Sequence, residues 1–155
     1  MVNVSKRKRV EQVVRGVRES SLGVVLFHQA VGEILDINVT DMKCLDIITL
    51  TGSTSPSQLS ELTGLSTGST TAMIDRLERR GLVERQPNPE DRRGTKIVLS
   101  KEAARKLHTL FRSMAHAMNK LVCSYSEEEL ETLSNFFTKV ISLWKEEREN
   151  LAALE

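Results

Sequence analysis

A group of small hydroxyl side chains lies near the middle of the chain, where a short helix is predicted to begin. Together with one alanine, its members are Ser66, Thr67, Ser69, Thr71 and Ala72. Hydroxyl groups can hydrogen-bond to base edges or phosphate oxygens, and the alanine methyl group can pack on the methyl group of thymine. The free amides and the dipole at a helix N-terminus also attract phosphate. These residue types in this position predict contacts with the major groove of DNA.

An arginine follows the hydroxyl residues on the same predicted helix. If Thr70, Ile74 and Leu77 face the core, a rotation of about 100° per residue defines an outward side. That side consists of Gly68, Ser69, Ala72, Asp75, Arg76 and Arg79. Arg76 is therefore the main candidate on this helix for contact with a phosphate or a guanine.

Two short helices position the hydroxyl residues. Ser55 followed by Pro56 is typical of a helix start, and Gly64 ends that helix. Ser66 is the predicted N-cap of the second helix, which ends before Gly81. Two such helices joined by a tight turn are typical of a helix-turn-helix.

A hairpin is predicted directly after the helix pair, with strands at Leu82–Arg85 and Thr95–Leu99 and a long polar tip between them. We call this hairpin the wing. Arg92 and Arg93 lie in its tip, where an arginine can enter a narrow minor groove. Asp91 can pair with an arginine and so shape the wing. The alternative is a solvated charged face, but the order of capped hydroxyl-rich helix and arginine-bearing tip favours DNA binding.

Long helices are predicted on both sides of this region. Apolar residues recur at steps of three and four from Val10 to Leu35, and Thr40 is a candidate N-cap for a short helix to Leu50. Ser100 and Ser126 each begin a later helix. The first of these has its predicted apolar face at Ala104, Leu107, Phe111, Met114, Met118 and Leu121. A second copy of the chain would bury these long apolar faces; the alternative is a monomer that folds them onto its own body.

The composition agrees with a mainly helical globular protein. The chain has 155 residues, 39% hydrophobic and 4% aromatic, with 22 basic and 21 acidic residues and a net charge of +1. This balance excludes a mainly disordered chain and disfavours a β-sandwich or barrel. No apolar run approaches the roughly 20 residues that span a bilayer, and the polar N-terminus lacks a secretory signal. We therefore expect no membrane partner and a cytoplasmic location.

Redox, metal and catalytic sites are weakly supported. Cys44 has no nearby basic residue except Lys43, and Cys123 has no adjacent base, so we expect buried, inert thiols. His108 and His116 do not share a helix face well, which disfavours a metal site. The sequence contains no nucleophile elbow, zinc-protease motif or phosphate-binding glycine loop. We expect no enzyme activity and no cofactor.

The segment LTGLSTGSTTAMIDRLERRGLVERQPNPEDRRGTKIVLS, Leu62–Ser100, resembles the MarR family of bacterial winged-helix regulators. The resemblance rests on the helix-turn-helix, the DRLE and GLV runs, the D-R-R at the wing and the closing Leu-Ser. It implies a winged helix over residues 37–100 and a helical dimerisation region over 1–36 and 101–155. It also implies a homodimer reading a pseudo-palindrome in double-stranded DNA, with Asp91 bracing the wing, Arg93 in the minor groove and Arg92 as a further contact.

His28 interrupts the apolar seam of the first helix. Such a histidine either hydrogen-bonds within an interface or contacts a ligand. The family resemblance implies a crevice for small, often aromatic acids, near His28, Met42 and the helix after the wing. We therefore expect a repressor, with release by a small effector as one alternative. The others are a ligand-independent regulator and a dimeric adaptor that has lost DNA binding.

Overall fold

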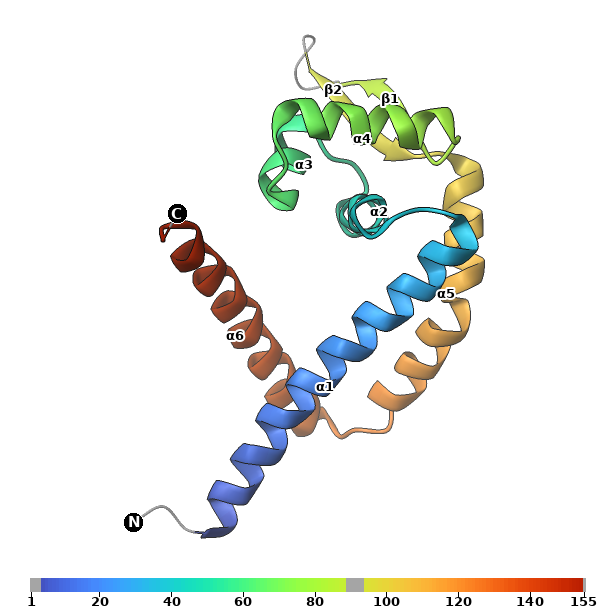
Figure 1. The fold of residues 1–155 in the computed structure, drawn as a ribbon. Coiled ribbons are helices and arrows are strands. Elements are labelled where there is room, and N and C mark those ends of the chain that lie inside the picture. Colours follow the sequence, from blue (N-terminus) through green and yellow to red (C-terminus); the bar gives the residue numbers. More distant parts are fainter. Residues whose placement is uncertain (1–3, 89–93, 155) are drawn as a thin grey trace. The chain divides into compact units, whose positions relative to one another are not determined.

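The computed structural model describes residues 4–88 and 94–154 (Figure 1). Within these ranges the helices and strands are α1 (Val4–Leu35), α2 (Val39–Thr51), α3 (Pro56–Thr63), α4 (Thr67–Arg79), β1 (Val83–Pro87), β2 (Thr95–Leu99), α5 (Lys101–Val122) and α6 (Glu127–Ala152). The chain divides into two compact units, residues 1–108 and 109–155. In the described ranges no single helix is long and apolar enough to cross a membrane, although α1 and α2 pass that test as a pair bent by 103°.

The long first helix is confirmed, and its two ends differ in burial. Val31 and Leu35, in the last turns of α1, are buried in the first unit. Val10, Val14 and Val24 belong to the same predicted apolar seam but are each more than half exposed. The C-terminal end of α1 therefore packs on its own unit, and most of its length presents apolar side chains to the surface.

The second helix begins earlier than the sequence predicted. Asn38, not Thr40, is its N-cap, because the Asn38 side chain accepts a hydrogen bond from the amide of Asp41 at 2.9 Å. Asp36, just before it, has a positive φ of 53° that turns the chain away from α1. Leu50, at the predicted end of this helix, is 87% exposed.

The predicted helix-turn-helix is confirmed. Ser55 and Gln58 form a capping box at the start of α3, with Pro56 at its first position. Gly64 ends α3 in the left-handed conformation, with φ of 74°, which glycine adopts without steric cost. Ser66 then caps α4 by accepting a hydrogen bond from the amide of Ser69. The side chains that α4 buries are Thr70, Met73, Ile74 and Leu77.

The wing is an antiparallel pair of strands that packs on the helix-turn-helix. Val83 pairs with Leu99, and Arg85 pairs with Ile97. Thr54 adds an isolated bridge to Ile97, through hydrogen bonds of 3.0 and 2.7 Å. The fully buried core beneath these strands contains Leu45, Ile48, Leu59, Met73, Ile74, Leu77, Val83 and Ile97. This core fixes α2, α3, α4 and the wing as one body.

Both helices after the wing start at their predicted caps. The Ser100 hydroxyl accepts a hydrogen bond from the amide of Ala103 and donates one to the carbonyl of Gly81. Ala103 and Leu107 are buried, whereas Ala104 is exposed, so the buried face of α5 is one residue away from the predicted one at its start. Ser126 and Glu129 form the expected capping box of α6, which contains no buried residue in its described range.

Candidate nucleic-acid interface

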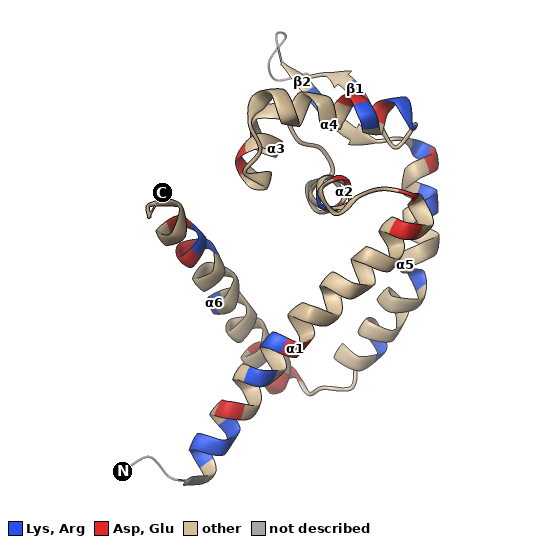
Figure 2. Ribbon diagram, viewed as in Figure 1, with Lys and Arg blue, Asp and Glu red and all other residues tan. Residues whose placement is uncertain are grey.

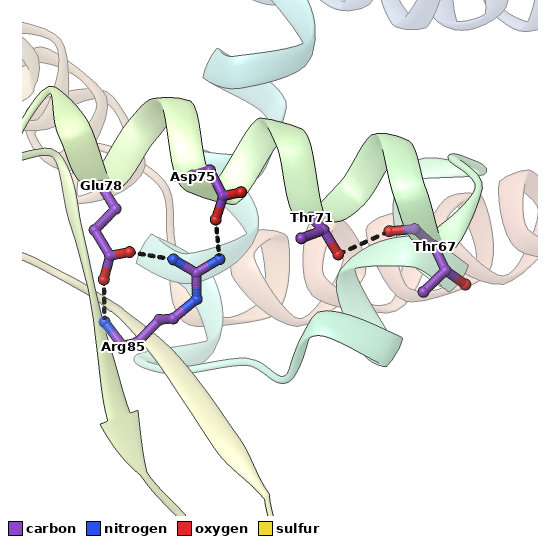
Figure 3. A network of polar contacts seen from close by, with 5 residues as sticks. All are labelled: Thr67, Thr71, Asp75, Glu78 and Arg85. Carbon is purple, nitrogen blue, oxygen red and sulfur yellow. Dashed lines mark hydrogen bonds and ion pairs between the residues drawn. The ribbon is translucent and has the colours of Figure 1, made fainter.

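The hydroxyl residues lie together on the exposed start of α4. Ser66, Thr67, Ser69, Thr71 and Ala72 are all exposed. The Thr71 hydroxyl donates to the carbonyl of Thr67 at 3.0 Å (Figure 3), and the Ser66 hydroxyl donates to Ser69 Oγ at 3.0 Å. Thr71 and Ser66 therefore use their hydrogen atoms within the protein and offer acceptors outward, whereas the Ser69 hydroxyl keeps its hydrogen for an outside acceptor.

Arg76 does not occupy the outward position that the helical rotation predicted. Its guanidinium turns toward α2 and donates two hydrogen bonds to Asp41, Nε to Oδ2 at 2.9 Å and Nη2 to Oδ1 at 2.5 Å. Asp41 is buried, and its hydrogen bonds raise the pKa of Arg76. A bidentate pair of this kind fixes both partners. Arg76 therefore fastens α4 to α2, and its predicted contact with DNA stays a prediction.

A second arginine fastens the wing to α4 (Figure 3). Arg85, on β1, pairs through Nη2 with Asp75 at 2.5 Å and through Nη1 with Glu78. The backbone amide of Arg85 also donates to Glu78 at 3.2 Å. Burial lowers the pKa of Arg85, but the hydrogen bonds and charges of the two carboxylates outweigh it and raise that pKa overall. The acidic residues of α4 thus hold β1 instead of facing DNA unpaired.

A third arginine joins the end of α4 to the end of α1. Arg80 donates to the carbonyl oxygens of Leu35 at 2.9 Å and Asp36 at 2.5 Å, and it pairs with the Asp36 carboxylate at 3.2 Å. The last carbonyls of a helix lack partners within the helix, and an arginine there also complements the negative end of the dipole. Sequence spacing does not reveal this contact, because its partners lie more than 40 positions apart.

The two strands of the wing lead to the predicted minor-groove residues. The amide of Asn88 donates to the carbonyl of Gly94 at 3.0 Å, so the strands remain paired up to these positions. Asp91, Arg92 and Arg93 lie outside the described residues. Lys and Arg residues also lie in the first turns of α1, whereas Glu127, Glu128 and Glu129 form the first turn of α6 (Figure 2).

A cavity of about 550 Å³ lies between α1 and α2. His28 and Met42, predicted to lie near a ligand crevice, both line it, and its apolar wall includes Val24, Val25, Ile37 and Val39. His28 Nδ1 lies 2.7 Å from Asp46 Oδ2. Burial raises the pKa of Asp46, although the interaction with His28 opposes that rise. The cavity therefore combines an apolar wall with a polar pair, as small-molecule sites commonly do.

The two cysteines have different surroundings. Cys44 is fully buried, and burial together with the charge of Asp41 raises the pKa of its thiol to about 12, so it stays protonated and unreactive. Cys123 is exposed, contrary to the prediction, and its sulfur lies 3.5 Å from the side-chain oxygen of Asn119. Within the described ranges, no three His, Cys, Asp or Glu side chains gather into a group that could hold a metal ion.

Comparison with known proteins supports a common fold and family. The sequence profile of the MarR family matches residues 37–95. The uncharacterized HTH-type transcriptional regulator YcgE of Bacillus subtilis is 37% identical over 147 residues, covering 95% of this chain and 96% of that protein. The multiple antibiotic resistance protein MarR of Escherichia coli is 32% identical over 110 residues, covering 69% of this chain and 75% of that protein.

One solved structure places DNA against the same kind of fold. A mutant of Escherichia coli MarR, crystallised in a complex with operator DNA, superposes on this chain with a TM-score of 0.52 and 25% sequence identity. The match covers 85% of this chain and 95% of that one.

Proposed function

Because this chain belongs to the MarR family of transcription regulators, we propose that it is a repressor that binds a pseudo-palindromic operator as a homodimer. It is a DNA-binding regulator rather than an enzyme. The observation that carries the proposal is the exposed hydroxyl row at the start of α4, on a helix that three arginines hold to its neighbours. A rigidly held helix can present its N-terminal side chains to base edges in one fixed register.

The base-reading residues are the exposed ones on the first two turns of α4. Thr71 and Ser66 present acceptors, which suit the amino groups of adenine or cytosine, and Ser69 can donate to a guanine or thymine oxygen. Thr67 hydrogen-bonds phosphate or a base edge, and Ala72 packs on a thymine methyl group. Arg93 and Arg92 supply minor-groove contacts from the wing, with Asp91 bracing it.

The homodimer is supported by the apolar side chains that the chain leaves exposed. Phe137, Ile141 and Trp144 recur at steps of four and three on α6 and are each more than half exposed. On α1, Val14 and Val24 each lie within about 40° of Val10 around the helix axis, at about 100° per residue, and all three are more than half exposed. Exposed apolar stripes of this length are typical of interfaces between subunits. We therefore assign residues 1–36 and 101–155 to dimerisation and 37–100 to DNA binding.

The cavity between α1 and α2 is the proposed effector site. Its volume of about 550 Å³ falls in the range of small-molecule sites. An aromatic ring can pack on the apolar wall beside Met42, and Lys43 supplies a positive charge for an acidic group, while Glu33 and Asp46 line the same cavity. The predicted ligand is therefore a small aromatic or acidic compound, which releases the regulator from DNA in the cytoplasm.

A mobility-shift titration on the DNA that flanks the chain's own coding region tests this function. We expect one shifted complex with this duplex and a much weaker one with a scrambled duplex of the same length. A panel of aromatic acids then tests release. Binding that no acid alters favours the ligand-independent regulator, and absence of binding to both duplexes favours the adaptor.

A further inference from the structure

Arg79 occupies the centre of the exposed face of α4. At about 100° per residue, it lies about 120–180° around the helix axis from each of the four buried side chains of α4. It lies within about 20° of Gly68 and Ala72, so it belongs to the same face as the hydroxyl row. Arg79 is exposed. The face that presents the start of α4 to the major groove therefore also presents Arg79.

Among the residues that the structure describes, the charge of Arg79 has no partner. Its helical neighbour Asp75, four positions earlier, is the natural partner for an ion pair. That carboxylate is held by Arg85 at 2.5 Å instead. Within residues 4–88 and 94–154, no hydrogen bond or ion pair involves the Arg79 side chain, whereas Arg76 and Arg80 are bound to α2 and to the end of α1.

The charges around Arg79 determine how its positive charge affects DNA binding. Arg85 carries one positive charge against the two negative charges of Asp75 and Glu78, so the three together remain negative by one. Arg76 and Asp41 cancel each other. Arg79 is then the charge that keeps the C-terminal half of α4 from repelling DNA.

We propose that Arg79 binds a DNA phosphate at the edge of the major groove, an inference that rests on the DNA binding proposed above. Arg79 lies about 18 Å along the helix from Thr67, at about 1.5 Å per residue, whereas the major groove is about 12 Å wide. When the start of α4 reads bases inside the groove, its last turn reaches the phosphates that border it. The contact contributes affinity for any sequence and does not discriminate between bases.

The test measures how DNA affinity depends on salt. Wild type, Arg79→Ala and Arg79→Lys are titrated by fluorescence anisotropy, over a series of salt concentrations, against the DNA that flanks the coding region and a random-sequence duplex of equal length. We expect Arg79→Ala to lower the slope of log affinity against log salt by about 0.9 per bound protomer, on both duplexes. Arg79→Lys should keep most of the slope, because a phosphate contact needs the charge.

Two controls separate this contact from other effects. Arg148→Ala on α6 removes the same charge from an exposed position and should keep the wild-type slope. Thermal unfolding of Arg79→Ala should match wild type. An unchanged slope, or an equal loss in Arg148→Ala, would overturn the proposal; a loss confined to the flanking DNA would make Arg79 a base contact instead. If wild type binds neither duplex, DNA binding itself is wrong.

Discussion

Asp41 and Arg76 show how one buried charge determines the role of its partner. The Asp41 carboxylate is buried, and each of its oxygens accepts a hydrogen bond from the Arg76 guanidinium. The Arg76 side chain is itself 40% exposed. The pair therefore lies at the boundary between the core and the surface. The buried carboxylate needs the arginine to balance its charge and satisfy its oxygens, whereas the arginine can also be solvated by water.

We expect Arg76→Ala to destabilise the fold by about 2–3 kcal/mol, because a buried carboxylate loses a charge-assisted partner. Urea unfolding followed by circular dichroism measures the change. Arg79→Ala is the matched control and should unfold at the wild-type urea concentration. A variant at position 76 with wild-type stability and a reduced salt slope in DNA binding would instead support the sequence-based assignment of Arg76 to phosphate.

Local residue patterns predicted the N-caps of α3, α4 and α6, although not Asn38 of α2, and they did not predict this pair. Ser55, Ser66 and Ser126 each act within three residues of their own position, so sequence alone identifies them. Asp41 and Arg76 are 35 positions apart and meet through the packing of α2 against α4. Helical rotation gives the direction in which Arg76 leaves the backbone, but a long side chain can turn toward a buried charge.

At the scale of elements, Arg85 sets how β1 lies on α4. Its guanidinium bridges Asp75 and Glu78, and its backbone amide adds a third hydrogen bond to the same helix. β1 leads directly into the segment that contains Arg93. The direction in which β1 leaves the helix-turn-helix therefore depends on this link.

A double-mutant cycle tests this dependence. We expect Arg85→Ala and Arg93→Ala each to weaken binding to the flanking DNA by about tenfold or more. Arg93→Ala removes the proposed minor-groove contact, and Arg85→Ala removes the link that positions it. The double variant should lose clearly less affinity than the product of the two single losses, because Arg93 contributes little once Arg85 no longer positions the wing. The pair Arg79→Ala and Arg93→Ala is the control and should be additive. Additivity in the first cycle would mean that Arg85 does not position the wing.

The existence of elements was more predictable than their buried faces. Apolar residues at steps of three and four positions predicted α1, but not that its buried residues in the described range are Val31, Gly32 and Leu35, near its end. The Ser100 cap predicted α5, yet Ala103 is buried and Ala104 is exposed, because Ser100 also bonds to Gly81 and fixes how the helix starts. Periodicity predicts which face of a helix is apolar, but packing between elements decides which part of that face is buried.

At the scale of the whole molecule, the net charge of +1 is unevenly distributed along the chain. Residues 75–96 contain seven basic and five acidic residues, and residues 127–155 contain eight acidic and three basic ones. Three of the basic residues in the first segment, Arg76, Arg80 and Arg85, pair with carboxylates and hold α4 to its neighbours. We therefore expect affinity for DNA to depend on the remaining cations rather than on the overall charge.

The exposed apolar stripe of α6 provides the test of assembly. Ile141 is 68% exposed and lies between Phe137 and Trp144 on one helix face. If a partner chain covers this face, Ile141→Glu places a charge in an apolar interface and should halve the mass measured by light scattering. Because two linked half-site contacts bind far more tightly than one, operator affinity should then fall by about a hundredfold or more.

Lys139→Glu is the matched control, since Lys139 lies about 160° around α6 from Ile141 and its substitution should leave the dimer intact. Ile141→Ala removes apolar area without adding a charge and should give an intermediate dissociation constant. A variant Ile141→Glu that stays dimeric and binds the operator as wild type does would place the dimer interface elsewhere. A variant that loses its helical circular dichroism would instead show that Ile141 packs within its own chain.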